Sequence, residues 1–104
     1  MHTYDIIYAT TCRDIPGYCD VTYCDGTVDT IPERIGLLYQ ELNRASNRGR
    51  YFMIGRSALI CENNIIQINP SREELVLGFD DLSIRHRVLT FSDYLLREFR
   101  NNLI

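Results

Sequence analysis

Cysteine and histidine are the residue types in this chain that could supply a nucleophile or bind a metal. The cysteines are Cys12, Cys19, Cys24 and Cys61, and the histidines are His2 and His86. Zinc sites favour ligand pairs two to four residues apart, whereas Cys19 and Cys24 are five apart on an expected strand and would point to opposite faces. Cys12, beside Arg13, has the best activating neighbour of the four thiols. We expect reduced thiols, no metal and no cofactor, and His86 on a packed or half-buried surface.

Phosphate chemistry is the next alternative, and its motifs are incomplete. Asp25-Gly26-Thr27 is similar to a motif of haloacid-dehalogenase-like phosphatases, but Tyr23 occupies the position of the nucleophilic aspartate. All 11 basic residues are arginine, so no lysine can hold a phosphoryl group or complete a P-loop. The pairs Glu73-Glu74 and Asp80-Asp81 are adjacent in sequence, so their carboxylates do not converge. Asp25-Gly26 is therefore interpreted as a hairpin turn of type I′.

The elements that position these residues are predicted from residue type and periodicity. Expected strands cover residues 4–11, 18–24, 27–30, 51–54, 57–61, 65–69 and 84–91, with turns at Pro16-Gly17, Asp25-Gly26 and residues 62–64. Around the Asp25-Gly26 turn, Val21, Tyr23 and Val28 are expected on one face of the hairpin. The opposite face is expected to carry Asp20, Thr22 and Asp29. Residues 71–82 fit a helix or a strand equally well.

Two helices are predicted. The first begins at a capping box, Thr30-Ile31-Pro32-Glu33, and runs to about residue 47, before Gly49. Its buried stripe is Ile31, Ile35, Leu38, Leu42 and Ala45. The second begins near Thr90 or Ser92 and turns Leu95, Leu96, Phe99 and Leu103 to the core. The predicted fold class is α+β with a mainly antiparallel sheet, and residues 1–104 are expected to form a single domain.

Charge is distributed unevenly along the chain. The net charge is −5 for residues 1–33, +4 for residues 34–56 and −2 for residues 57–104, which gives −3 overall. Two candidate binding surfaces follow. The first is an acidic, tyrosine-containing hairpin region of Tyr18, Asp20, Tyr23, Asp25 and Asp29, with Tyr4 and Tyr8 nearby. The second is the arginine segment 44–51, with Arg44, Arg48 and Arg50.

Three functions fit these surfaces. In size, acidity and lack of a catalytic signature the chain resembles the small accessory inhibitors of phages and other viruses, including anti-CRISPR proteins. That resemblance implies a non-enzymatic module that binds a host defence or nucleic-acid-handling complex through a protein interface. The alternative is a small RNA- or single-stranded-DNA-binding protein that uses the arginine segment 44–51. The third is a small enzyme that acts through Cys12 or His86.

Composition excludes some classes of protein. The hydrophobic content of 45% is that of a globular chain, and no apolar run approaches the ~20 residues of a membrane span. The sequence begins without a basic and apolar leader, so we expect a cytoplasmic protein, in the cytoplasm of the host cell if it is viral. A pI of about 5.2 weighs against nucleic acid. Exposed strand edges make a homodimer plausible.

Overall fold

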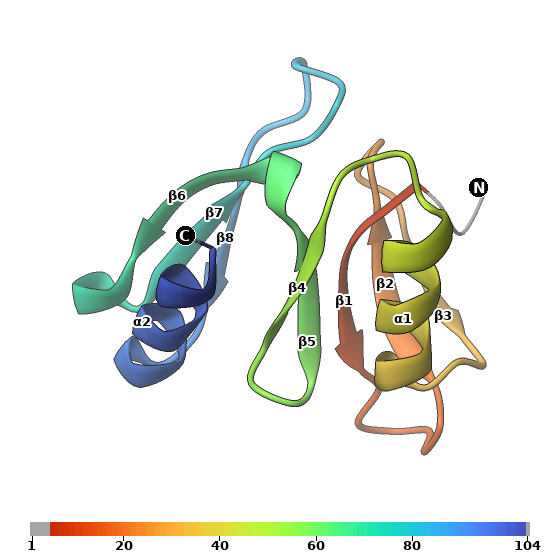
Figure 1. Ribbon diagram of the computed structural model, residues 1–104. Coiled ribbons are helices and arrows are strands. Elements are labelled where there is room, and N and C mark those ends of the chain that lie inside the picture. Colours follow the sequence, from red (N-terminus) through yellow and green to blue (C-terminus); the bar gives the residue numbers. More distant parts are fainter. Residues whose placement is uncertain (1–4, 104) are drawn as a thin grey trace.

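A computed structural model describes residues 5–103 (Figure 1), so His2 and Tyr4 lie outside the described residues. The strands are β1 (Ile6–Thr11), β2 (Cys19–Tyr23), β3 (Val28–Ile31), β4 (Tyr51–Ile54), β5 (Ala58–Cys61), β6 (Ile65–Asn69), β7 (Glu74–Leu77) and β8 (Arg87–Thr90). The α-helices are α1 (Ile35–Ala45) and α2 (Asp93–Asn102), and short 3-10 turns are η2 (Glu62–Asn64) and η3 (Pro70–Arg72). The predicted α+β class is confirmed.

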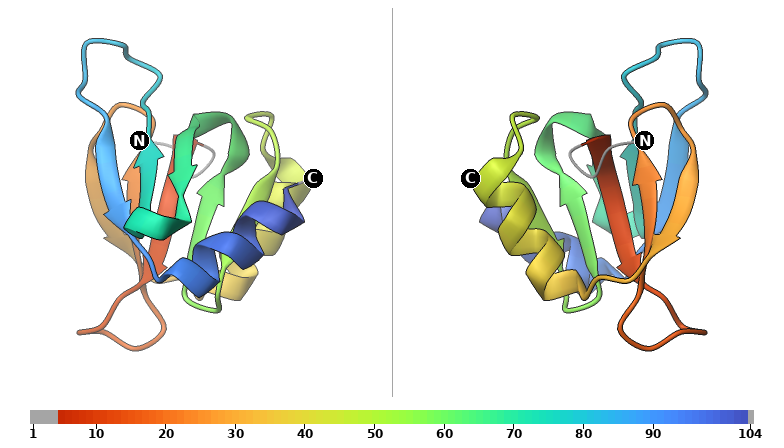
Figure 2. Two further views of the ribbon diagram at one scale, coloured as in Figure 1. Left: turned by 90° about the vertical axis from the view of Figure 1, so that its left-hand side faces the viewer. Right: turned by 90° about the vertical axis from the view of Figure 1, so that its right-hand side faces the viewer.

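The strands form two antiparallel sheets. The larger has the order β3-β2-β1-β5-β4 and the smaller has the order β6-β7-β8. Figures 1 and 2 show the two sheets as neighbouring layers, with α1 and α2 on the same side of the molecule. Helix α1 contacts β1, β4 and β5, whereas α2 contacts β4 and β6. The two layers share one apolar core, which includes Ile7, Leu59, Leu75 and Phe99.

The predicted hairpin at Asp25-Gly26 is present, but its register differs by one residue. Gly26 has a φ of +87°, whereas Asp25 does not have a positive φ, so the turn is not of type I′. The N–H of Gly26 donates to the carbonyl of Tyr23, which makes the loop one residue longer than predicted. A one-residue shift changes which side chains share a face. Val28 therefore lies opposite Thr22, and Asp29 lies opposite Val21.

The predicted capping box at the start of the first helix is wrong. Thr30 belongs to β3, where its hydroxyl donates to Asp20 Oδ1 at 2.8 Å. Pro32 follows the strand, because proline has no N–H to donate to a ladder. Helix α1 starts at Ile35, after an Arg34 N-cap that makes no side-chain cap bond. Leu38 and Leu42 are its buried residues, as the periodicity predicts.

The structure of the C-terminal half resolves the choice between helix and strand for residues 71–82. Residues 71–82 form part of η3, then β7 and a protruding loop, with no α-helix. Strand β8 begins only at Arg87, so His86 lies before it and is exposed. The prediction that His86 faces a packed surface is therefore wrong. Helix α2 starts where expected, with Ser92 Oγ accepting from the Leu95 N–H at 3.3 Å.

A side chain blocks the free edge of β4. The amide of Asn43, from α1, accepts from the Tyr51 N–H at 2.8 Å and donates to the Tyr51 carbonyl at 3.1 Å. The side chain thus makes the two bonds that a neighbouring strand would make there. Tyr51 is 1% exposed, and its hydroxyl donates to the Ile6 carbonyl at 2.6 Å. These bonds fix the arginine segment 44–51 to the sheet.

Candidate nucleic-acid interface

The arginine segment 44–51 does not form a free basic surface. Arg48 turns inward, and its side chain is 17% exposed. Arg44 pairs with Glu41 at 2.6 Å, and the guanidinium of Arg50 lies 4.8 Å from the centre of the Phe52 ring. Tyr51 is buried, so it cannot stack on a base. This segment therefore offers less to a nucleic acid than its composition suggests.

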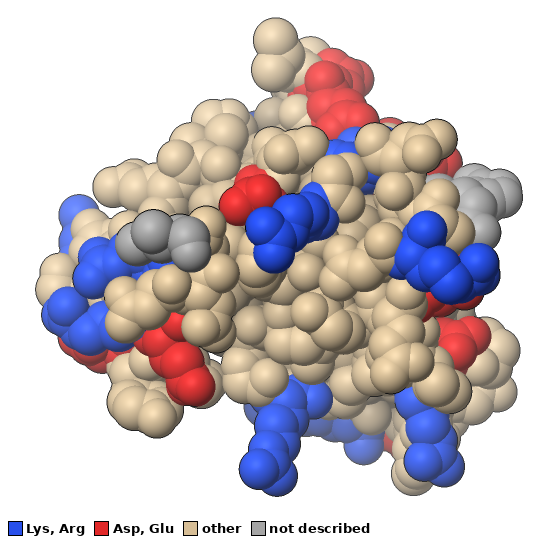
Figure 3. Space-filling view, viewed as in Figure 1, with Lys and Arg blue, Asp and Glu red and all other residues tan. Residues whose placement is uncertain are grey.

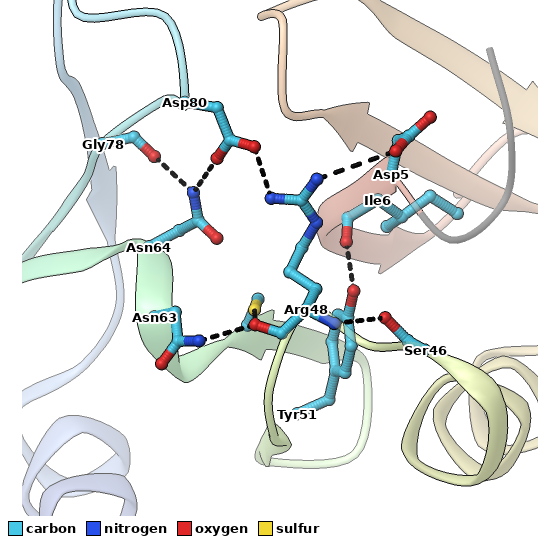
Figure 4. A network of polar contacts seen from close by, with 10 residues as sticks. Asp5, Ile6, Ser46, Arg48, Tyr51, Asn63, Asn64, Gly78 and Asp80 are labelled. Atoms are coloured by element: carbon cyan, nitrogen blue, oxygen red, sulfur yellow. Dashed lines mark hydrogen bonds and ion pairs between the residues drawn. The ribbon is translucent and has the colours of Figure 1, made fainter.

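Arg48 is the centre of a polar group that we name the Arg48 cluster: Asp5, Arg48, Asn64 and Asp80 (Figure 4). Its Nη1 lies 2.6 Å from Asp80 Oδ2, and its Nη2 lies 3.6 Å from Asp5 Oδ1. The amide of Asn64 donates to Asp80 Oδ1 at 3.2 Å and to the Gly78 carbonyl at 3.0 Å. The cluster ties the α1–β4 connection to the residue before β1 and to the loop after β7.

The charges of the Arg48 cluster support one another. Partial burial opposes the ionised form of Asp80, but the hydrogen bonds from Arg48 and Asn64 outweigh burial and lower the pKa of this carboxyl. Burial likewise opposes the charge of Arg48, but the hydrogen bond and charge of Asp80 outweigh it and raise the pKa of the guanidinium. Both groups are therefore charged at neutral pH, and Arg48 is satisfied within the protein.

Acid should weaken the fold through this cluster. Because the pKa of Asp80 is lower in the folded state than in the unfolded chain, its ionisation stabilises the fold above the unfolded pKa of about 3.9. That contribution is lost as pH falls through the folded pKa. In urea titrations, the free energy of unfolding of the wild type should decrease as pH falls below 4. We expect this decrease to be smaller in Asp80→Asn. The control Asp14→Asn, in an exposed loop, should change the decrease less. Equal slopes for both variants would contradict a stabilising role of Asp80.

The acidic hairpin region is only partly a surface. Asp20, Asp25 and Asp29 are exposed and Tyr18 is half-buried, but Tyr23 is 5% exposed and belongs to the core. The side chain and backbone of Thr27 donate to Asp25, which lowers the pKa of its carboxyl. Asp29 accepts from the Thr30 N–H at 2.8 Å. The aspartates thus have local partners in the turn and along β3.

A different set of arginines gathers at one end of the larger sheet. We name this the arginine end: Arg13 in the β1–β2 connection, Arg34 before α1 and Arg56 in the β4–β5 turn. These three segments lie together at the lower end in Figures 1 and 2, and basic side chains project from that edge in Figure 3. All three residues are exposed, and none has an ion pair among residues 5–103. Sequence reasoning missed this set because its members lie in separate loops.

Backbone contacts hold these loops together. The Thr11 N–H, at the end of β1, donates to the Ser57 carbonyl at 2.9 Å. This bond places the β1–β2 connection beside the β4–β5 turn, where Gly55 has a φ of +63° that glycine tolerates. A polar hollow of about 440 Å³ lies there, and its lining includes Thr11, Arg13 and Ser57 as well as the carboxylates of Asp14 and Asp20. The positions of Arg13 and Arg56 are thus fixed relative to one another.

The start of α1 adjoins the same end. A second hollow, of about 430 Å³, is lined by Thr11, Pro16, Arg34 and Gly36 among others. Helix α1 has no side-chain cap and no acidic residue in its first turn, in contrast to α2 with its Ser92 cap. Within the part of the chain that the structure describes, no side chain accepts from the first-turn N–H groups of α1, and the positive end of the helix dipole lies beside Arg34.

The residues considered for metal or nucleophilic chemistry do not converge. Among residues 5–103, no three His, Cys, Asp or Glu side chains come together as metal ligands. Cys19 and Cys61 are buried. Burial, with the nearby charges of Glu33 and Asp20, raises the pKa of Cys19 to about 11, which disfavours the thiolate. The described part of the chain also has no helix long and apolar enough to cross a membrane.

Comparison with known proteins gives a fold relationship and no sequence family. No family model and no curated protein matches the chain. The fold is similar to a solved structure, the LytTr DNA-binding domain of a response regulator from Bacillus cereus. The TM-score is 0.58, the sequence identity is 13%, and the match covers 99% of this chain and 84% of that one.

This likeness corrects our main functional hypothesis. The sequence analysis favoured a protein-binding inhibitor of the viral, anti-CRISPR-like kind. The fold is instead one that a DNA-binding domain uses, and nothing in it supports a viral inhibitor. The alternative, a nucleic-acid-binding protein, agrees better with this finding. The correction has a simple cause, since size and acidity are properties that unrelated folds share.

Proposed function

We propose that this domain is a non-enzymatic module that binds double-stranded DNA through the arginine end. The observation that carries the proposal is the gathering of Arg13, Arg34 and Arg56, all exposed and none ion-paired to another described residue, at one end of the larger sheet. The similar fold of a LytTr DNA-binding domain supports it. Arginine suits phosphate contacts because its planar guanidinium forms two parallel hydrogen bonds.

The first turn of α1 provides a further phosphate contact. Its N–H groups lie beside a hollow that Arg34 lines. Helix N-termini attract phosphate because unpaired N–H groups and the helix dipole both favour negative charge. In this proposal the DNA backbone lies across the hollow at the start of α1, between Arg34 and the pair Arg13 and Arg56, and not across the other hollow, which Asp14 and Asp20 also line. The three arginines then contact successive phosphates from three different loops.

The net charge of −3 is compatible with this site because a DNA-binding surface is local. Several carboxylates lie away from the arginine end: Asp25 is in the β2–β3 turn, and Asp80 and Asp81 are in the loop after β7. Figure 3 shows acidic side chains at the upper end of the molecule and along its sides, while those that project from the lower edge are basic.

The test is a titration of fluorescent duplex DNA of mixed sequence, followed by anisotropy at several salt concentrations. We expect binding at 50 mM salt that weakens linearly in a log–log plot as salt rises, because phosphate contacts release counterions. Single-stranded DNA and duplex RNA are measured in parallel, and both should bind less tightly. Absence of duplex binding at 50 mM salt would overturn the proposal. Tighter binding of the single strand would favour the stacking alternative.

A further inference from the structure

Four strands lie at the edges of the two sheets. Within the described residues, β4 and β6 are covered, and β3 has one of its outward backbone groups occupied. On β3, the Thr30 N–H donates to Asp29 Oδ1 at 2.8 Å. On β4, both backbone groups of Tyr51 are bonded to Asn43. Strand β6 has a register irregularity and lies against α2. An exposed strand edge can pair with a strand of another chain unless features such as these protect it.

Strand β8 is the edge without such protection. The Phe91 N–H donates to the Glu73 carbonyl at 3.2 Å, toward β7. In an antiparallel ladder the bonds alternate, so Leu89 also faces β7, whereas Val88 and Thr90 direct their backbone groups away from it. No side chain among residues 5–103 bonds to these outward groups. Val88 is also 55% exposed, although it is an apolar residue.

We propose that β8 pairs antiparallel with β8 of a second copy of this chain, around a two-fold axis at Leu89. In this register Val88 lies opposite Thr90 of the second copy, and each such pair exchanges two backbone hydrogen bonds. Leu89 lies opposite Leu89 of the second copy. Opposite residues share a face of the sheet, so in both copies this register keeps Leu89 on the core side and Val88 and Thr90 on the exposed side. The two three-stranded sheets then form one continuous sheet across the dimer.

Charge selects this edge and this partner. The strand is preceded by Arg85 and His86 and is followed by Asp93 at the start of α2. Antiparallel pairing around Leu89 directs Arg85 of each copy toward the end of β8 of the other, where α2 begins with Asp93, a half-exposed carboxylate that is also ion-paired with Arg97 of its own helix. Arg85 is exposed and has no ion pair among residues 5–103, so it is available for this contact. The β3 edge is the opposite case, because self-pairing there would set Asp29 near its own copy.

The test uses a proline that disturbs only the dimer. Val88→Pro removes an N–H that the monomer does not use, and proline is tolerated on an edge strand whose N–H faces solvent. Val28→Pro is the matched control, because Val28 is an equally outward valine on β3 and is 67% exposed. Sedimentation velocity over a concentration series should show the mass of the wild type and of Val28→Pro rising from 12.2 kDa toward twice that value. Val88→Pro should remain at 12.2 kDa, with an unchanged circular dichroism spectrum.

A second variant keeps the test independent of proline. Arg85→Glu changes an exposed side chain and should weaken dimerisation at least tenfold, because it places like charges together at both ends of the interface. Raising the salt concentration should reduce the difference between Arg85→Glu and the wild type. A wild-type mass that stays at 12.2 kDa up to about 1 mM would overturn the proposal. So would a folded Val88→Pro or Arg85→Glu that associates as the wild type does.

Discussion

Replacing Arg13, Arg34 and Arg56 together by glutamine is expected to weaken duplex DNA binding by roughly 100-fold at low salt, or about 1 kcal/mol for each arginine. Glutamine keeps much of the side-chain length and its ability to hydrogen-bond but removes the charge. Each lost phosphate contact should also reduce the magnitude of the log–log salt slope by about 0.9, so the slope should fall by about 2.7. Anisotropy titrations at four salt concentrations measure both quantities.

The control variant removes the same number of positive charges from another part of the surface. Arg72, Arg97 and Arg100 lie on η3 and α2, are exposed, and can be replaced by glutamine together. The ion pairs of Arg72 with Glu74 and of Arg97 with Asp93 are solvent-exposed, and such pairs contribute little to stability. This triple variant should bind duplex DNA within about threefold of the wild type. Equal losses in the two triple variants would mean that overall charge, and not the arginine end, determines binding.

Replacing Arg48 by methionine is expected to lower the free energy of unfolding by about 2 kcal/mol. The substitution removes the cation between Asp5 and Asp80, which leaves two carboxylates facing a partly desolvated site. Methionine retains the unbranched apolar stem, so little packing is lost. Urea unfolding followed by circular dichroism measures the change. Arg44→Met is the matched control, and the solvent-exposed pair with Glu41 should account for less than about 1 kcal/mol.

The same Arg48 variant also tests the location of the DNA site. Arg48 belongs to the segment whose composition first suggested nucleic-acid binding, yet it lies near the loop after β7 (Figure 4), at the end of the molecule opposite the β4–β5 turn (Figure 1). Folded Arg48→Met should therefore bind duplex DNA as the wild type does. A folded variant that loses DNA binding would return the interface to residues 44–51 and contradict the arginine end.

Local patterns in the sequence predict the elements well. The spacing of Leu38 and Leu42 predicts the buried face of α1, and Ser92 predicts the start of α2, because both signals act within one or two helical turns. The Asp25-Gly26 turn predicts a hairpin but not its register. Two turn types accept this dipeptide, and the choice between them moves every residue of β3 to the other face.

Contacts between distant segments could not be predicted in the same way. Arg48 finds Asp80 32 residues further along the chain, and no local pattern connects them. The arginine end is formed from three connections, and its members became neighbours only when the sheet order placed β1 beside β5. A count of charges along the chain gave most weight to residues 44–51, where the arginines are dense but engaged. Arg56 is exposed, whereas Arg48 is ion-paired within the protein. This difference, and not the number of arginines nearby in the sequence, makes Arg56 the better candidate for binding DNA.

The block on the β4 edge has a consequence for the order of folding. Asn43 and Tyr51 are eight residues apart, so the loop between them closes fast and at small entropic cost. The pairing of β1 with β5 joins residues about fifty positions apart and forms later in a chain of this topology. Partly folded chains could pair with one another through an open β4 edge. Asn43 therefore covers this edge before the larger sheet is complete. One amide side chain thus protects the β4 edge of nascent molecules from intermolecular strand pairing.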